Sequence, residues 1–292
     1  MPVDNVNRGT SNVVLPYQVS SEIWQKTIES SAVMQLARQI TLPGSGLEFQ
    51  TITGDPEASW VAETNAKPVG VHTFGAKKMK GYKLAVIEPF SNEFRRDKEA
   101  LYEACVNRLP EAIGKKFDST VFGGKDGKPG DNFDVLGECT TVDIESDVWG
   151  GLVTADATVA ANDSVLNGWV LAPKAKTLLL NKTDTTGRPI FVSSVQNEGT
   201  VNYLMGNPTY FKKGVYKAGT PEQLGYAGDW TSALYGVVDA LNISISDQAT
   251  LKVGDDMLAL WQNNMFAVRV EFEVGFVVKD TADFVKLVGK SA

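Results

Sequence analysis

The sequence predicts an α+β fold, with helices and strands in separate stretches of the chain. The first observation is a long amphipathic segment at residues 92–124, and the second is an alternating segment at residues 266–279. The third is a succession of strand, helix and loop at residues 168–189. Since helices and strands each bury one face against another element, the three segments together indicate packed layers of helix and sheet.

Residues 92–124 form the longest segment with a helical period. Its apolar side chains recur at four-residue steps along one stripe: Leu101, Cys105, Leu109, Ile113, Phe117 and Val121. We expect Asp97 near the N-terminal end of the helix dipole, and Gly123 and Gly124 as a left-handed stop. A helix over about 97–122 would be about 39 Å long at ~1.5 Å per residue. Such a helix would act as a strut across a small domain.

Pro110 lies inside this predicted helix. A proline removes the hydrogen bond to the residue four positions earlier, here Val106, and typically costs ~3 kcal/mol in a helix interior. The apolar stripe keeps its phase across Pro110, which favours one continuous but bent helix over two abutting helices. The bend could allow the helix to differ between copies of the chain.

The composition excludes several classes of protein. The chain has 292 residues, 43% hydrophobic and 22% charged, which is ordinary for one large or two modest globular domains. It carries 35 acidic against 28 basic side chains, a net charge of -7, so it is not a general nucleic-acid binder. No secretory signal and no membrane-spanning run are present, which indicates synthesis in the cytosol.

The N-terminal third combines a polar arm, a helix and a hairpin. Residues 1–20 are polar with little periodicity, whereas residues 21–40 have helical spacing and predict a helix. Residues 47–53 and 73–87 alternate and predict the two arms of a long hairpin. The segment between the arms is too polar and too rich in Pro and Gly to continue either strand. Four lysines in the second arm would protect its edge: Lys77, Lys78, Lys80 and Lys83.

The Gly-rich and Asp-rich segment at residues 123–138 raises the question of a metal. Asp126, Asp131 and Asp134 suggest a calcium loop, but their spacing does not match an EF-hand and no Glu closes the loop. We interpret this segment as a solvated loop.

The second half of the chain predicts a mixed layer and late strands. A helix with breaks is expected at 144–166, a buried strand at 168–173 and a helix at 174–180, while 192–226 have weak periodicity. Further strands are expected at 234–238, 243–246 and 266–279. The last strand presents one apolar face, which we expect to pack on the long helix: Phe266, Val268, Val270, Phe272 and Val274.

No constellation of catalytic, cofactor-binding or metal-binding residues can be assigned. His72 is the single histidine and is interpreted as a surface residue, and the two cysteines, Cys105 and Cys139, as buried small hydrophobes. The six tryptophans are scattered and fit core or interface packing better than ligand stacking. A chain with an unpacked arm and an unpacked hairpin indicates assembly with copies of itself.

The order of these elements resembles the major capsid proteins of tailed bacteriophages, which have the Hong Kong 97-type fold. The resemblance covers nearly the whole chain and includes several loose motifs: WVAETNAKP at 60–68, NRLPEAIGKKFD in the long helix, the segment 169–189, LMGNPT at 204–209, YAGDW at 226–230, and QNNMFAVRVEFEVGFVVKDTADFVKL near the end.

The resemblance implies a division of the chain. Residues 1–44 would be an N-arm and 45–85 an extended loop (E-loop). A peripheral domain would comprise 86–144 and 247–280, with the long helix as its spine, and an axial domain would comprise 145–246 and 281–292. Seven residues would be candidates for contacts between subunits: Trp60, Glu63, Lys77, Lys78, Lys80, Arg95 and Arg96.

The same resemblance implies a structural function. The chain would form pentamers and hexamers of an icosahedral shell around double-stranded DNA, in a virion assembled in the host cytoplasm with a portal and a separate scaffolding or decoration protein. An encapsulin-like shell around an enzyme is the nearest alternative, and a monomeric enzyme is a distant one. Some relatives cross-link subunits, and Lys67, Asn264 and Glu271 occupy matching positions, although similar residues also occur in relatives that do not cross-link.

Overall fold

A computed structural model gives the structure of the chain. It describes residues 27–28, 30–54, 56, 58–62, 66–67, 69–97, 99–184, 186–188, 190–191, 203–254 and 256–290. The polar arm predicted at 1–20 lies outside these residues.

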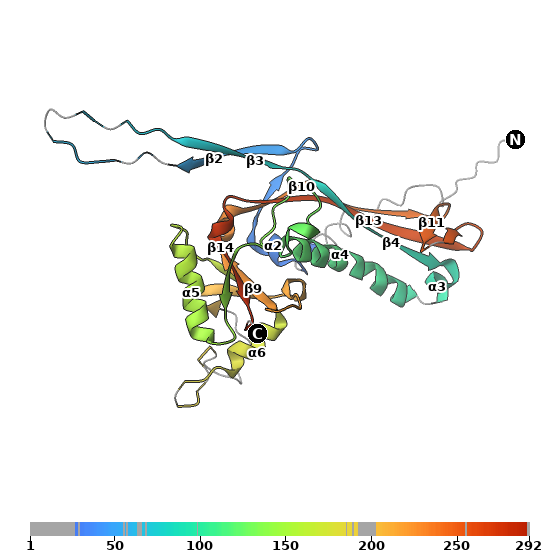
Figure 1. Ribbon diagram of the computed structural model, residues 1–292. Coiled ribbons are helices and arrows are strands. Elements are labelled where there is room, and N and C mark those ends of the chain that lie inside the picture. Colours follow the sequence, from blue (N-terminus) through green and yellow to red (C-terminus); the bar gives the residue numbers. More distant parts are fainter. Residues whose placement is uncertain are drawn as a thin grey trace.

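One half of the molecule is a four-stranded sheet covered by a long helix (Figure 1). The strand order is β1 (Arg38–Thr41), β10 (Ala233–Ser246), β13 (Met265–Val278) and β4 (Tyr82–Ser91). The helix α4 (Glu99–Val121) packs on one face of this sheet, and its side chains Leu109, Ile113, Phe117 and Val121 are buried there. The predicted α+β class and the predicted strut are therefore confirmed.

The contact between the helix and the late strand is confirmed as well. The five predicted apolar side chains of β13 are buried, whereas Arg269 on the opposite face is exposed. The ring of Phe117 meets that of Phe276 edge-on, with centroids 6.4 Å apart. Alternation in β13 and the four-residue period in α4 thus create the two faces of one core.

The predicted left-handed stop at the end of the long helix is wrong, whereas the role of Asp97 at its N-terminal end stays a prediction. The helices α3 (Asn92–Asp97) and α4 (Glu99–Val121) follow one another along the predicted segment, and residue 98 between them lies outside the described residues. Gly123 has no left-handed φ. The last carbonyls of α4 have tertiary partners instead: Leu136 N donates to Val121 O at 2.7 Å, and Tyr226 Oη donates to Phe122 O at 2.8 Å. A glycine cap is therefore not needed.

The helix α4 continues through Pro110, as the apolar stripe predicted. The bend at Pro110 and its variation between copies of the chain stay predictions.

The other half of the molecule is a six-stranded sheet. Its order is β5 (Thr140–Asp143), β14 (Phe284–Val288), β9 (Gln223–Gly228), β6 (Gly168–Leu171), β8 (Asn207–Phe211) and β7 (Tyr203–Leu204). The helices α5 (Val148–Ala160) and α6 (Pro173–Asn181) accompany it. Its core includes Trp169, whose Nε1 donates to Leu204 O at 3.1 Å. The strand at 168–171 and the helix that follows it are confirmed.

Several strands differ from the prediction. The strands expected at 234–238 and 243–246 form one strand, β10, because irregular pairing between Val237 and Asn242 breaks the alternation without ending the ladder. Four strands have no counterpart in the prediction: β9, β14, and the two strands of a hairpin, β11 (Thr250–Val253) and β12 (Asp256–Ala259). The first two are buried strands, which lack a period-two pattern.

The helix predicted at 21–40 is confirmed in part: among the described residues, 27, 28 and 30 are helical, Ser31 interrupts the helix, and the helical part ends at Leu36. The described helix α2 covers Ala32–Leu36, and Ala37 turns the backbone to an extended conformation. Residues from Arg38 then pair in parallel with β10, with Arg38 opposite Leu234. Sheet pairing overrides the helical spacing at Ile40, which lies in β1.

The predicted hairpin exists, but its second arm is shorter than expected. Strand β2 (Leu47–Gly54) pairs antiparallel with β3 (Thr73–Met79), and the chain then bends before β4 enters the four-stranded sheet. Gly81 lies at this bend, where an added Cβ would be only 2.5 Å from Val238 Cγ2. The side chain of Val238 therefore leaves no room for a side chain at this position, which favours glycine.

The Gly-rich segment after α4 is only partly a solvated loop. It contains a short helix, η1 (Lys125–Gly127), and the side chain of Asp131 is exposed. Phe133 and Leu136, however, are buried in the main core. The interpretation as a loop open to solvent is therefore wrong for the second half of the segment.

Candidate assembly surfaces

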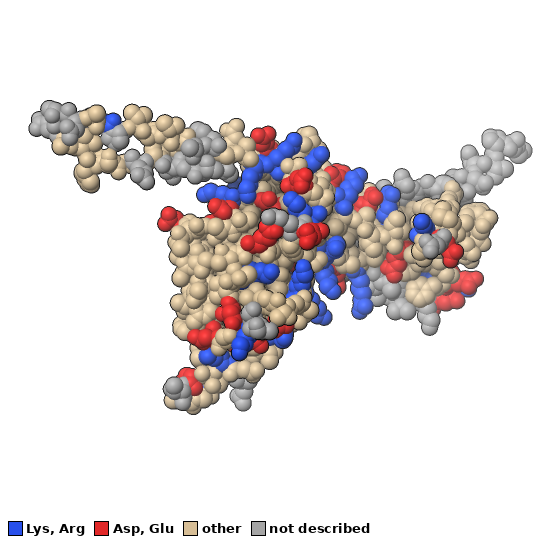
Figure 2. Space-filling view, viewed as in Figure 1, with Lys and Arg blue, Asp and Glu red and all other residues tan. Residues whose placement is uncertain are grey.

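The β2–β3 hairpin projects from the body of the molecule (Figure 1). Beyond the paired strands the described residues include apolar side chains that are almost fully exposed, among them Trp60, Val69 and Val71. Figure 2 shows that the described surface of this arm carries few charges on the side in view. An exposed apolar surface of this kind indicates a contact with another molecule.

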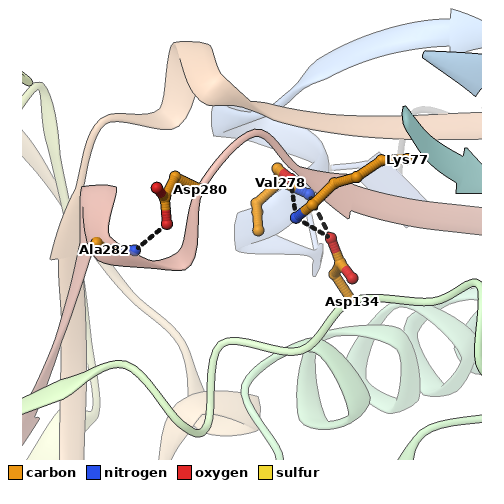
Figure 3. Close-up of polar contacts among 5 residues, drawn as sticks. All are labelled: Lys77, Asp134, Val278, Asp280 and Ala282. Atoms are coloured by element: carbon orange, nitrogen blue, oxygen red, sulfur yellow. Dashed lines mark hydrogen bonds and ion pairs between the residues drawn. The ribbon is translucent and has the colours of Figure 1, made fainter. Parts of the chain in front are cut away.

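The base of the hairpin is held by a polar cluster on β3, β13 and the loop after α4. Lys77 Nζ lies 3.2 Å from Asp134 Oδ2 and donates to Val278 O at 2.8 Å (Figure 3). The same Asp134 oxygen accepts a hydrogen bond from Val278 N at 3.1 Å. Beside this cluster Met79 is fully buried. The hairpin is therefore anchored at its base while its tip is exposed.

Asp280 lies near this cluster and caps the next turn of the chain. Its side chain accepts a hydrogen bond from Ala282 N at 2.9 Å, at the start of the short helix η4 (Thr281–Asp283) (Figure 3). This cap fixes the turn between β13 and β14, and so connects the two sheets.

The predicted contact residues fall into different environments. Lys78 and Lys80 are exposed, but Lys77 is half-buried in the internal ion pair, so its first role is structural. Glu63 lies outside the described residues. Arg96 is exposed, and its hydrogen bond to Asp97 raises the pKa of the Arg96 guanidinium.

Arg95 has an internal partner that the sequence did not reveal. Its guanidinium lies 4.7 Å from the centroid of the Phe266 ring, which is a cation–π distance. This contact holds α3 on the end of β13. The contact could not be inferred from the sequence, because residues 95 and 266 meet only in the folded chain.

The three residues at the positions of a cross-link are not together within the chain. Lys67 is exposed on the hairpin. Asn264 Oδ1 accepts a hydrogen bond from Asn92 Nδ2 at 3.0 Å, whereas Glu271 pairs with Arg269 at 3.4 Å. Asn264 and Glu271 are seven positions apart, and the strand between them begins at Met265, so they lie about 24 Å apart at ~3.4 Å per residue. They could meet only between different subunits.

A buried carboxylate that the sequence analysis missed connects α2 to α4. Asp118 is 1% exposed and accepts hydrogen bonds from Ser31 Oγ, from Ala32 N at 2.8 Å and from Val33 N at 3.4 Å. Burial raises the pKa of Asp118 to about 6, although these hydrogen bonds act in the opposite direction. The signal available in the sequence was a carboxylate directly beside the apolar stripe, next to Phe117.

Other side chains with potential chemistry have structural roles. Cys139 is buried, and its burial raises the pKa of the thiol to about 12. His72 is exposed, as predicted. Within the described part of the chain there is no group of His, Cys, Asp or Glu side chains that could hold a metal ion. In the same part, no helix combines the length and hydropathy needed to cross a bilayer.

The sequence matches the model of the phage capsid family over residues 11–289. It is 30% identical over 281 residues to the "Probable major capsid protein gp17" of Mycobacterium phage L5, covering 90% of this chain and 85% of that protein. It is 24% identical over 282 residues to the "Major capsid protein" of Staphylococcus phage 80alpha, covering 93% and 83%.

Solved structures have the same fold. A chain titled Mycobacterium phage Bobi superimposes with a TM-score of 0.73 at 23% identity, covering 90% of this chain and 91% of that one. A chain titled as the capsid of an empty GTA particle gives a TM-score of 0.62 at 15% identity, with 90% of each chain covered. The chain therefore belongs to the phage capsid family, and it is a structural shell protein of the tailed-phage type and not an enzyme.

Proposed function

We propose that the chain assembles into pentamers and hexamers of an icosahedral shell that encloses double-stranded DNA. The observation that supports this proposal most directly is the β2–β3 hairpin, which is anchored by Lys77 and Asp134 but exposes Trp60 and its apolar neighbours. A rigid base with an uncovered apolar tip suits a contact with the next subunit. Many such contacts, each weak alone, would stabilise a closed shell.

The proposed division of the chain follows the Hong Kong 97-type fold. The four-stranded sheet with α4 as spine would be the peripheral domain, the β2–β3 hairpin the E-loop, and the six-stranded sheet the axial domain around fivefold and sixfold axes. Strand β5 pairs with β14 in the six-stranded sheet, which supports an axial boundary near residue 140 instead of 145. Of the proposed N-arm at 1–44, α2 and β1 pack against the body.

Expression of the chain alone, followed by electron microscopy and nuclease treatment of the particles, tests this function. The proposal predicts closed shells and, when they are produced in infected cells, nuclease-protected DNA inside them. Shells that protect a protein cargo and no DNA would instead identify an encapsulin-like compartment. In this proposal the particle assembles in the host cytoplasm. A portal and separate scaffolding or decoration proteins would take part in its assembly.

A covalent cross-link between subunits is a separate proposal with its own test. Lys67 of one subunit would form an isopeptide bond with Asn264 of a second and release ammonia, with Glu271 of a neighbouring subunit acting as base. Boiled and reduced particles should then give a ladder above the monomer on a denaturing gel, and Lys67→Arg should abolish the ladder. A single monomer band from mature particles would refute the cross-link without affecting the shell function.

A further inference from the structure

Four exposed lysines gather where the C-terminal half of α4 meets the short helix η2 (Lys213–Val215). Lys115 and Lys116 lie on α4, Lys213 begins η2, and Lys217 follows it. None of the four forms an ion pair with any residue in the described part of the chain. We call these four residues the lysine surface.

The lysine surface borders two hollows that adjoin each other. Lys115 and Lys213 line the first, and Lys116 and Lys217 line the second. Gly214 lines both, and η2 lies so close to α4 that a Cβ on Gly214 would be 3.2 Å from Asp118 Cβ. Figure 2 shows many Lys and Arg side chains over the middle of the molecule, with Asp and Glu side chains among them. The lysines therefore belong to one continuous concave surface.

Few acidic side chains offset this positive charge. Glu111 and Asp126 are the exposed acids among the residues that line the two hollows. Asp118 also borders one hollow, but its oxygens are engaged in the buried contacts with the start of α2. Burial, together with the nearby charge of Lys217, lowers the pKa of Lys286. Although the chain has a net charge of -7, the described residues around these two hollows form a locally basic surface.

We infer that the lysine surface binds phosphate groups of double-stranded DNA inside the shell. The inference rests on the proposed function, since it requires that the shell encloses DNA. Lysine ammonium groups contact phosphates as point charges and read no sequence, which suits a wall that must accept any stretch of a genome. The acidic balance of the rest of the chain would limit the contact to this surface.

Salt dependence gives the expected size of the effect. Each phosphate neutralised contributes a slope of about -0.9 in the logarithm of affinity against the logarithm of salt concentration. Four contacts on one subunit would therefore weaken binding roughly 100-fold between 50 and 200 mM salt. Loss of the four charges should remove most of this dependence.

The test measures binding of a fluorescent 30-base-pair duplex to the full-length chain by anisotropy at these two salt concentrations. The test variant is K115Q/K116Q/K213Q/K217Q. The matched control, R188Q/K252Q/K279Q/K290Q, removes the same charge from exposed positions elsewhere. We expect the test variant to bind the duplex at least tenfold more weakly than the parent at 50 mM salt, since loss of one phosphate contact already costs about this much. The affinity of the control should stay within about twofold of that of the parent.

Two outcomes would overturn the inference. Equal affinity of the test variant and the control would show that the lysine surface is not where DNA binds. Displacement of the duplex by poly-glutamate as efficiently as by unlabelled duplex of equal charge would indicate an acidic protein segment as the partner. Circular dichroism of both variants establishes that they are folded. If parent particles protect DNA but the two variants bind alike, this inference fails while the proposed function stands.

Discussion

The buried carboxylate of Asp118 should make the stability of the chain depend on pH in an unusual direction. Most acidic groups stabilise a fold when they lose their proton. For Asp118, burial raises the pKa from 3.8 to about 6, so the folded chain holds this proton more tightly than the unfolded chain does. The stability that protonation provides is complete below about pH 4 and is lost as the pH rises through 6.

The magnitude follows from the two pKa values. The rise from 3.8 to about 6 corresponds to about 3 kcal/mol between the protonated and ionised forms, at ~1.36 kcal/mol for each tenfold step. About half of this, roughly 1.4 kcal/mol, falls between pH 5 and pH 7.5. Asp118→Asn cannot ionise, so it should not show this component.

Urea unfolding of the unassembled chain at pH 5 and pH 7.5 measures this effect. Between pH 5 and pH 7.5 the parent should lose about 1.4 kcal/mol of its free energy of unfolding through this group, whereas Asp118→Asn should not. The free energy of unfolding of the variant minus that of the parent should therefore rise by about 1.4 kcal/mol. Asp126→Asn, at an exposed acid, serves as the matched control. A difference between Asp118→Asn and the parent that is the same at both pH values would refute the assignment.

Three further substitutions or probes test other parts of the structure. Lys77→Gln removes the partner of Asp134 at the hairpin base and should lower the free energy of unfolding by about 1 kcal/mol, with faster proteolysis of the hairpin. Trp60→Ala should leave the melting temperature of the unassembled chain within about 1 °C, since this side chain is fully exposed, but should reduce the yield of particles. Cys139 should resist alkylation at pH 8 until the chain is unfolded, as mass spectrometry of its peptide would show.

Elements with a clear period could be predicted from the sequence. The stripe from Leu109 to Val121 and the alternation from Phe266 to Val274 each mark one buried face, and the structure packs the two faces together. Strand β6 was recognised as a short apolar run between turn residues, even though all four of its side chains are buried. In these cases the pattern of apolar residues within one segment is enough to predict which of its side chains are buried.

Features that depend on distant segments could not be predicted. Residues 38–41 have helical spacing in the sequence but form strand β1, because they pair with β10. The helix α4 ends where residues of a loop and of the six-stranded sheet donate hydrogen bonds to its last carbonyl groups. Lys77 at the hairpin base contacts Asp134, 57 residues away, and Asp118 contacts residues at the start of α2 that are 85 or more positions away. Side-chain type and spacing do not contain this information.

The state of association of the isolated chain tests the central conclusion most directly. Electron microscopy of the concentrated, purified chain, with light scattering on the same sample, is the measurement. An assembling shell subunit should give closed particles, or the pentamers and hexamers from which they are built, and Trp60→Ala should shift the distribution toward smaller species. A chain that stays monomeric at every concentration tested would contradict the account.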